Sequence, residues 1–362
     1  MSESRRRAMR QGRPDWGDSV IRITRTILAT VLLCGSASIA AAQSVEQFYR
    51  GKTVTIVVGS SPGGGYDAYA RLLSRHFSKH IPGSPMVVVS NMPGGGSEIA
   101  AGYIANVAPK DGAHIAATYS NQPLDSVLEN APPLPYDPKK LKYLGSAARE
   151  EWLCVVRSSS PVQSFSDAFK TQIAVAGVMN AQTGYVPMMM NRLLGTQFKV
   201  IMGYPGSREQ VQAIQTGEVD GMCGLGYTSL KSQYPSMLKN GEVKIILQEM
   251  QKEVPELTAM GAPLVGSYIK DDVKRRVFEI VNSQQEFSRP YFVGPGVPED
   301  RLAALRTAFL QAWNDPELLR EAEKMSLDVM PMSGVDLQAL LEKIYSSPPE
   351  VLKLAREAVD MK

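Results

Sequence analysis

Two Pro-Gly-Gly-Gly segments, which begin at Pro62 and at Pro93, are the strongest chemical signal in the sequence. Each follows a run of apolar, β-branched residues and precedes a segment with helical spacing. Glycine between a strand and a helix lets a ligand approach the backbone, because no Cβ intervenes. The following helix directs free N–H groups and the positive end of its dipole at the same place. Two such turns at one sheet edge predict a site for an anion, most simply a carboxylate.

The first segment also matches the G-x-S-x-G nucleophile elbow of esterases, with Ser61 as the nucleophile. The oxyanion hole of such an enzyme needs the N–H of the residue after the serine, and Pro62 has none. The catalytic base is expected to be a histidine late in the chain, but the last histidine is His114. The sequence therefore disfavours a hydrolase.

A dinucleotide site and a metal site are poorly supported. Gly63-x-Gly65-x-x-Ala68 fits the G-x-G-x-x-A form of the dinucleotide fingerprint, but the next strand ends without the acidic residue that holds a ribose. His76 and His80 share a helix face without a third ligand nearby in the sequence, a pattern typical of a solvated face. We predict no cofactor and no metal.

Asp67 stands in the first turn of the helix that follows the first glycine segment. A carboxylate there can bond backbone N–H groups and favours the helix dipole. It can instead contact an ammonium or hydroxyl group of a ligand, and both interpretations stay open. Arg71 is one turn further on and is expected to pair with Asp67 and support the loop.

Strand-like and helix-like runs alternate along most of the chain, which predicts parallel sheets with right-handed crossovers. The predicted strands are residues 52–59, 86–90, 114–118, 152–156, 173–177, 199–202, 219–224 and 243–247. The pattern restarts after residue 151, and glycine and proline at 294–296 suit a linker. We therefore predict two α/β lobes with a cleft between them. Lobe 1 comprises residues 43–150 plus 291–362 with the C-terminal helices, and lobe 2 comprises residues 151–290.

The first 42 residues are predicted to be a signal peptide. Arg22 and Arg25 precede an apolar stretch from Ile27 to Ala42, which is too short for a membrane span of about 20 residues. This segment holds seven arginines and three acidic residues, so 32 basic and 33 acidic residues remain after it. No basic stripe is left to bind nucleic acid.

Two cysteines, Cys154 and Cys223, follow the signal segment. An exported chain with an even pair can form one disulfide. The alternative is two buried free thiols that act as small apolar residues.

Several motifs, in this order after a signal peptide, resemble the extracytoplasmic solute receptors of the tripartite tricarboxylate transporter family (Bug or TctC-like proteins). They are Pro62-Gly63-Gly64-Gly65-Tyr66-Asp67 with Arg71, Asn91-Met92-Pro93-Gly94-Gly95-Gly96, Pro109-Lys110-Asp111-Gly112, Tyr204-Pro205-Gly206-Ser207 and Gly217-Glu218-Val219-Asp220-Gly221. The resemblance implies a two-lobed periplasmic-binding-protein architecture of type II, which closes over a small organic acid. Two departures from the family pattern are Ala113 in place of an aromatic residue and few glycines after Gly177.

The resemblance implies that backbone amides of both glycine loops and ordered water hold the ligand's carboxylate. The implied ligand-binding residues are Gly63, Gly64, Gly65, Tyr66, Asp67, Gly94, Gly95, Gly96 and Ser97 in lobe 1, and Ala181, Gln182, Thr183, Gly184, Tyr204 and Asp220 in lobe 2.

These expectations describe a periplasmic, non-enzymatic receptor for a small carboxylate that works as a monomer with the membrane subunits of a transporter. An exported two-lobed enzyme is one alternative, and a receptor that feeds a sensor kinase is another. No nucleotide or nucleic acid is expected as a partner.

Overall fold

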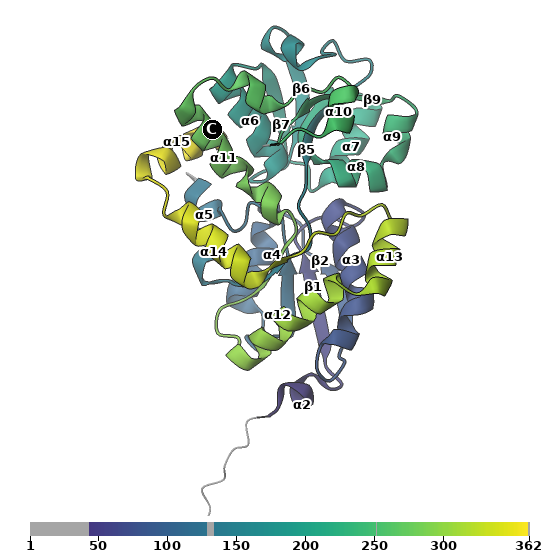
Figure 1. The fold of residues 1–362 in the computed structure, drawn as a ribbon, viewed down its shortest axis with the longest axis vertical. Helices are drawn as coiled ribbons and strands as arrows, with labels where there is room; N and C mark the ends of the chain where they lie inside the picture. The colour runs from purple at the N-terminus through teal and green to yellow at the C-terminus, as the bar shows by residue number, and fades with distance from the viewer. Residues whose placement is uncertain (1–42, 129–133, 251, 361–362) are drawn as a thin grey trace, which may run out of the picture. The chain divides into compact units, whose positions relative to one another are not determined.

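Two mixed β-sheets form the framework of this computed structural model (Figure 1). The structure describes residues 43–128, 134–250 and 252–360, so the predicted signal peptide lies outside the described residues. Among the described residues, no helix is long and apolar enough to cross a membrane.

The first sheet has the order β11-β4-β10-β3-β1-β2 and the second has the order β7-β6-β8-β5-β9. The strands of the first sheet are β1 (Thr53–Val58), β2 (Met86–Asn91), β3 (His114–Ala117), β4 (Lys142–Ser146), β10 (Pro290–Val293) and β11 (Met332–Ser333). The strands of the second sheet are β5 (Trp152–Arg157), β6 (Ile173–Gly177), β7 (Phe198–Met202), β8 (Gly221–Gly226) and β9 (Val243–Gln248). The order β4-β10-β3-β1-β2 in the first sheet corresponds to the order β9-β5-β8-β6-β7 in the second. All eight predicted strands are present, and the fold is a two-lobed α/β architecture as predicted.

Each sheet combines parallel and antiparallel neighbours. In the first, β1 pairs in parallel with β2 and β3, while β10 lies antiparallel between β3 and β4. In the second, β6 pairs in parallel with β7 and β8, while β5 lies antiparallel between β8 and β9. Strand β10 was not among the predicted strands; it lies directly before the predicted linker at 294–296, and its four residues are all buried in the first sheet. The chain therefore passes twice between the sheets.

The two passages run side by side, and we call residues 147–151 and 285–289 the crossing segments. The N–H of Ala147 donates to the carbonyl of Arg289 at 3.0 Å, and the N–H of Glu150 donates to the carbonyl of Gln285 at 3.1 Å. These backbone bonds make the connection between the sheets a paired, hydrogen-bonded strip.

Helices cover both sheets. Those associated with the first sheet are α2 (Val45–Tyr49), α3 (Gly65–Phe77), α4 (Glu98–Gly102), α5 (Asp125–Leu128), α12 (Glu299–Trp313), α13 (Pro316–Lys324) and α14 (Gly334–Tyr345). Those that follow the strands of the second are α6 (Gln182–Leu194), α7 (Ser207–Thr216), α8 (Tyr227–Gln233), α9 (Pro235–Lys239), α10 (Pro255–Ala259) and α11 (Asp272–Asn282). The last helix is α15 (Pro349–Val359).

The helical spacing of apolar residues in α12 produces a buried stripe. Leu302, Leu305, Phe309 and Trp313 are at most 1% exposed. The rings of Trp313 and Tyr69 of α3 lie 5.9 Å apart between centroids, so this stripe joins the returning C-terminal segment to α3.

The position of the last helix differs from the one predicted when the chain was divided into lobes. The sequence analysis assigned all C-terminal helices to lobe 1, and α14 does pack on β4. However, α15 packs against α6, α11 and α5, so the C-terminal segment bridges the two lobes (Figure 1). Pro348 and Pro349 end one helix and start the next, which lets the chain change direction between them.

The structure joins Cys154 to Cys223 in a disulfide. The two residues stand on neighbouring antiparallel strands, β5 and β8, where the register shifts between Leu153 and Val155. Both cysteines are buried, and the Sδ of Met190 lies 4.0 Å from the Sγ of Cys154. The sequence alone is compatible with a disulfide or with two separate buried thiols. The pairing of β5 with β8 is what brings the two cysteines together.

The double variant Cys154→Ala/Cys223→Ala tests the contribution of the cross-link. We expect the free energy of unfolding to fall by about 2–4 kcal/mol, because the cross-link restricts the unfolded chain. Urea titration followed by circular dichroism measures this difference. The reduced wild type is the control, and equal midpoints for the oxidised wild type and the variant would contradict the prediction.

Candidate functional site

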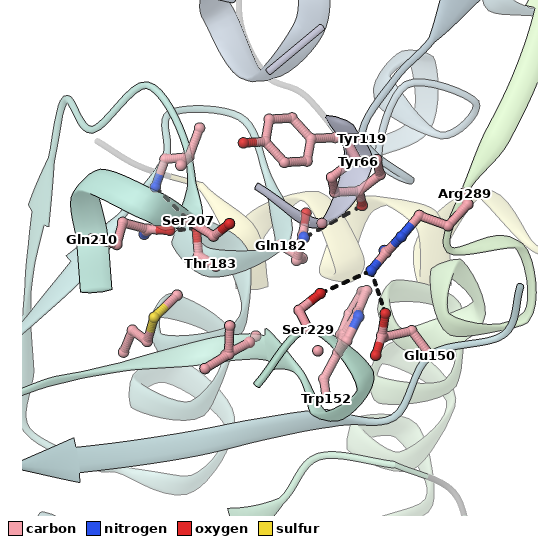
Figure 2. A pocket seen from close by; sticks show the side chains of 16 residues that line it. Tyr66, Tyr119, Glu150, Trp152, Gln182, Thr183, Ser207, Gln210, Ser229 and Arg289 are labelled. Atoms are coloured by element: carbon pink, nitrogen blue, oxygen red, sulfur yellow. Dashed lines mark hydrogen bonds and ion pairs between the residues drawn. The ribbon is translucent and has the colours of Figure 1, made fainter. Parts of the chain in front are cut away.

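A small pocket of about 20 Å³ lies between the two sheets, beside the crossing segments (Figure 2). Gly65, Tyr66 and Tyr119 line it from the first sheet's side. Glu150 and Arg289 line it from the crossing segments. From the second sheet's side come Trp152, Val178, Gln182, Thr183, Ser207, Gln210, Met222, Gly224, Leu225, Gly226 and Ser229.

Three helices begin at this pocket. Gly65, Gln182 and Ser207 are the first residues of α3, α6 and α7, and all three line the pocket. Helix α3 follows a strand of the first sheet, and α6 and α7 follow strands of the second. The pocket therefore receives the positive ends of helix dipoles from both lobes.

These three helices have no side-chain cap. Their N-cap residues are Gly64, Ala181 and Gly206. None of these residues carries a side-chain oxygen that could accept from the first N–H groups. Elsewhere in the chain, Asp271, Asp315 and Ser333 cap α11, α13 and α14, whereas α12 and α15 also lack a side-chain cap. The uncapped helix starts thus face the pocket, where a ligand acceptor can take the place of a capping side chain.

The first glycine loop contacts the start of α7. The hydroxyl of Ser61 donates to Glu209 Oε2 at 2.9 Å. A Cβ added to Gly64 would lie 3.1 Å from Ser207 Oγ, and one added to Gly65 would lie 2.5 Å from Ser229 Oγ. The absence of side chains therefore allows the loop to approach the other lobe closely.

Asp67 supports this loop from inside. Its Oδ2 accepts from the N–H of Gly63 at 2.9 Å and from Arg71 Nε at 2.8 Å, and its Oδ1 accepts from Asn91 Nδ2 at 2.9 Å. Although burial favours the neutral form, these hydrogen bonds lower the pKa of Asp67. The carboxylate holds the loop to the end of β2 and does not line the pocket.

The second glycine loop reaches the other lobe beside the pocket. Gly96 has a φ of +58°, and a Cβ added there would lie 2.3 Å from the carbonyl oxygen of Asn180. Ser97 is fully buried, and its hydroxyl donates to the carbonyl of Gly59 at 2.9 Å. Neither Gly94, Gly95, Gly96 nor Ser97 lines the pocket; this loop forms a contact between the lobes instead.

The remaining residues named from the sequence divide similarly. Gln182 and Thr183 line the pocket, whereas Gly64, Ala181 and Gly184 adjoin lining residues without lining it, and Gly63 is one position further away. Tyr204 donates to Glu218 Oε1 at 2.6 Å, outside the pocket. Asp220 accepts from Arg157 Nη2 at 2.9 Å and from the N–H of Ala174 at 3.3 Å, so its carboxylate ties two strands of lobe 2 together.

Sequence reasoning missed the ion pair that the crossing segments place in the pocket wall. The side chains of Arg289 and Glu150 are 4% and 0% exposed, and the guanidinium donates to the carboxylate. Glu150 Oε1 also accepts from the N–H of Thr228 at 2.9 Å. Burial alone would lower the pKa of Arg289, but the neighbouring carboxylate of Glu150 raises it. Removal of either partner would leave an uncompensated buried charge.

Aromatic rings complete the surroundings of Arg289. Its guanidinium carbon lies 4.4 Å from the ring centroid of Tyr66 and 5.0 Å from that of Tyr69. Nη2 also donates to Ser229 Oγ at 3.1 Å, and Nη1 donates to the carbonyl of Ser288 at 3.1 Å. The arginine is thus held by protein groups on several sides.

Two further lining residues, Ser207 and Gln210, could have been found from a pattern in the sequence. Ser207 and Gln210 follow Gly206 in the first turn of a helix after a strand, which is the same arrangement as in the first glycine loop. Trp152 and Ser229 had no signal of this kind, because the pairing of β5 with β8 and the position of α8 bring them to the pocket.

The buried carboxyl group of Glu249 is hydrogen-bonded to the backbone of a residue that lines the pocket. Glu249 is 0% exposed, and its Oε2 accepts from the N–H of Gly224, a lining residue, at 2.9 Å. Burial raises the pKa of Glu249 well above its ordinary value, because the charged form loses its hydration.

His76 of α3 and His80 of the helical turn that follows it contact α13 and its N-cap residue instead of facing solvent alone. His76 Nε2 lies 2.6 Å from Glu321 Oε2, and His80 Nε2 lies 2.8 Å from Asp315 Oδ2. Lys79 Nζ also contacts Asp315 at 2.7 Å, so the carboxylate beside His80 already has a cationic partner.

Comparisons with known proteins agree with the fold. The model of the "Tripartite tricarboxylate transporter family receptor" family matches residues 69–346. A curated relative, the "UPF0065 protein in tcbD-tcbE intergenic region" of Pseudomonas sp. (strain P51), is 39% identical over 88 residues, which are 24% of this chain. That match spans about a quarter of the relative's length (25%).

Solved structures share the architecture at low sequence identity. The periplasmic binding protein BugD has a TM-score of 0.67 and 21% identity, over 86% of this chain and 99% of that one. MatC from Rhodopseudomonas palustris, with bound malate, has a TM-score of 0.64 and 20% identity, over 85% and 99%. A second R. palustris protein, with adipate, has a TM-score of 0.66 and 20% identity, over 84% and 97%. Family and fold are those of solute-binding receptors and not of enzymes.

Glu249→Gln tests the protonation of the buried carboxyl group. The folded protein retains a proton that the unfolded chain loses near the ordinary glutamate pKa, so the wild type should lose stability as pH rises above about 4.5. The variant should lack this loss, and its free energy of unfolding relative to wild type should increase from pH 5 to pH 8. Urea titrations at both pH values measure the difference, with exposed Glu323→Gln as the matched control. Parallel pH profiles of wild type and Glu249→Gln would contradict the assignment.

Proposed function

Because the chain belongs to the tripartite tricarboxylate transporter receptor family, we propose that it is a periplasmic receptor that captures a small carboxylate between its lobes and delivers it to the membrane subunits of such a transporter. The observation that carries the proposal is the convergence of three uncapped helix starts, from both lobes, on one pocket. Free N–H groups and dipole ends suit an anion and need little reorganisation to hold it. The relatives with malate and adipate support the carboxylate class.

The same geometry supplies a mechanism for ligand-dependent closure. A carboxylate that accepts from α3 in lobe 1 and from α6 or α7 in lobe 2 makes all its contacts only when the lobes are together. It therefore stabilises the closed state by its differential affinity. The close contacts of Gly65 with Ser229 and of Gly96 with Asn180 belong to this closed arrangement.

Export supports the same role. The predicted signal peptide directs the chain to the periplasm, and the receptor family works with membrane subunits. Closure can then present one surface, formed by both lobes, to the transporter only when ligand is bound.

A thermal-shift panel of mono-, di- and tricarboxylates, aromatic acids and amino acids tests the function. We expect at least one carboxylate to raise the melting temperature in a concentration-dependent manner, as binding to the folded state requires. In Gly65→Ala the new Cβ would stand 2.5 Å from Ser229 Oγ inside the pocket, and the shift should be largely lost. Gly266→Ala, whose Cβ meets nothing closer than 3.9 Å, is the control and should keep it. No shift with any carboxylate would overturn the proposal.

Gly96→Ala tests closure separately. Its Cβ would lie 2.3 Å from a backbone oxygen of the other lobe, so the closed state should be disfavoured and ligand-induced compaction reduced. Small-angle X-ray scattering with and without ligand measures the radius of gyration. Gly241→Ala is the matched control, because it has a similar φ of +65° and nothing within 4 Å of the new Cβ. Equal compaction in both variants would show that this contact does not limit closure.

A further inference from the structure

Two glutamines in the pocket wall each have one amide atom without a partner among the described residues. Gln182 is 7% exposed and Gln210 is 0% exposed, and both line the pocket (Figure 2). The unpartnered atom, as placed, is Oε1 in both residues. A buried polar atom without a hydrogen bond is costly, so these two amides point to a ligand that completes their bonding.

The partners of the amides decide which end faces the ligand. The hydroxyl oxygen of Thr183 accepts from the N–H of Val178 at 3.0 Å and lies 3.0 Å from the amide nitrogen of Gln210. A hydroxyl that already accepts from a backbone N–H still has its own proton to donate. The Gln210 amide can accept that proton only through its oxygen. Because the two ends of an amide have nearly the same shape, rotation by 180° satisfies Thr183 and turns the NH₂ group toward the pocket.

Gln182 has the same relation to Tyr66. The hydroxyl oxygen of Tyr66 accepts from the N–H of Ser120 at 3.3 Å and lies 3.4 Å from the amide nitrogen of Gln182. The side chain of Ser120 is a further hydrogen-bond partner of Tyr66, and with the amide oxygen toward Tyr66 the tyrosine proton has Gln182 as an acceptor as well. The NH₂ group of Gln182 then also faces the pocket as a donor.

The charge of the pocket limits how many negative charges it can hold. Its only charged lining residues, within the described part of the chain, are Glu150 and Arg289, and they pair with each other. The guanidinium also bonds Ser229 and the carbonyl of Ser288, so its charge is already paired, and Nε is its one nitrogen without a partner among the described residues. The positive potential therefore comes from the starts of α3, α6 and α7, each equivalent to about half an elementary charge. Together the three starts are equivalent to about 1.5 elementary charges, which compensate one carboxylate group fully and a second one only in part.

We propose that Gln182 and Gln210 bind the ligand's carboxylate through their side-chain NH₂ groups and that this charge-neutral pocket selects a carboxylate with a single negative charge. The inference rests on the proposed function and specifies its ligand class. It also names Gln210 as a binding residue beside Gln182.

Calorimetric titration of the purified protein with length-matched acids tests the ligand class. The pairs are butyrate with succinate and hexanoate with adipate. We expect the singly charged acid of the preferred length to bind at least tenfold more tightly than its dicarboxylate partner. Tighter binding of the dicarboxylates would overturn this inference and leave the receptor function in place, whereas no binding of any carboxylate in the wider thermal-shift panel would overturn both.

Variants Gln210→Glu and Gln182→Glu test the direction of the hydrogen bonds. Each exchanges the amide NH₂ donor for an acceptor of the same shape. If the amides donate, each change should weaken binding of the preferred monocarboxylate by 100-fold or more, because a donor becomes a repelling charge. Unchanged or stronger binding would mean that the pocket needs acceptors, and the inference would be wrong.

Gln210→Leu separates the lost donor from the added charge. It should weaken binding by about 10- to 100-fold, the range for a hydrogen bond to a charged group. Gln212→Glu on the exposed side of α7 is the control and should bind as wild type does. Melting temperatures without ligand establish that each variant is folded. Wild-type affinity in a folded Gln210→Leu variant would exclude the residue from binding.

Discussion

The first N–H groups of a helix must find acceptors, and this requirement organises the centre of the protein. Helices α3, α6 and α7 begin with Gly64, Ala181 and Gly206 as N-caps, none of which supplies a side-chain oxygen. The same chain caps α11, α13 and α14 with Asp or Ser, and α12 and α15, which begin away from the pocket, have proline as N-cap. At the pocket, the glycine and alanine N-caps leave the first N–H groups open to a ligand. An anion from solution is the acceptor that such an arrangement is suited to receive.

The connection between the lobes adds an electrostatic constraint. Arg289 and Glu150 stand on the two crossing segments, which also share backbone hydrogen bonds. Their mutual neutralisation keeps the pocket wall free of net charge while the tyrosine rings of α3 surround the guanidinium. Because a buried pair is sensitive to the loss of either partner, this contact also makes the geometry of the crossing specific. The pocket wall therefore offers helix dipoles and neutral amides.

The two glycine loops, alike in sequence, have different positions. The first brings Gly65 into the pocket wall, with Asp67 holding the loop from behind. The second brings Gly96 against the backbone of Asn180 in the other lobe. Both positions depend on the lack of a Cβ, but the first loop forms part of the pocket wall and the second allows an approach between the lobes.

The sequence by itself determined the local structure: the eight strands, the helices between them and the glycine turn before α3, because strand alternation, helical spacing and glycine act over a few residues. It also indicated Gln182 and Thr183, which do line the pocket. It could not reveal that Pro290–Val293 completes the first sheet, that α15 packs on lobe 2, or that Cys154 meets Cys223. Those contacts join residues far apart in the chain, as does the pairing of Arg289 with Glu150 across 139 positions. Only the tertiary structure decided them, because burial and charge pairing depend on which segments meet in space and leave no periodic trace in either segment alone.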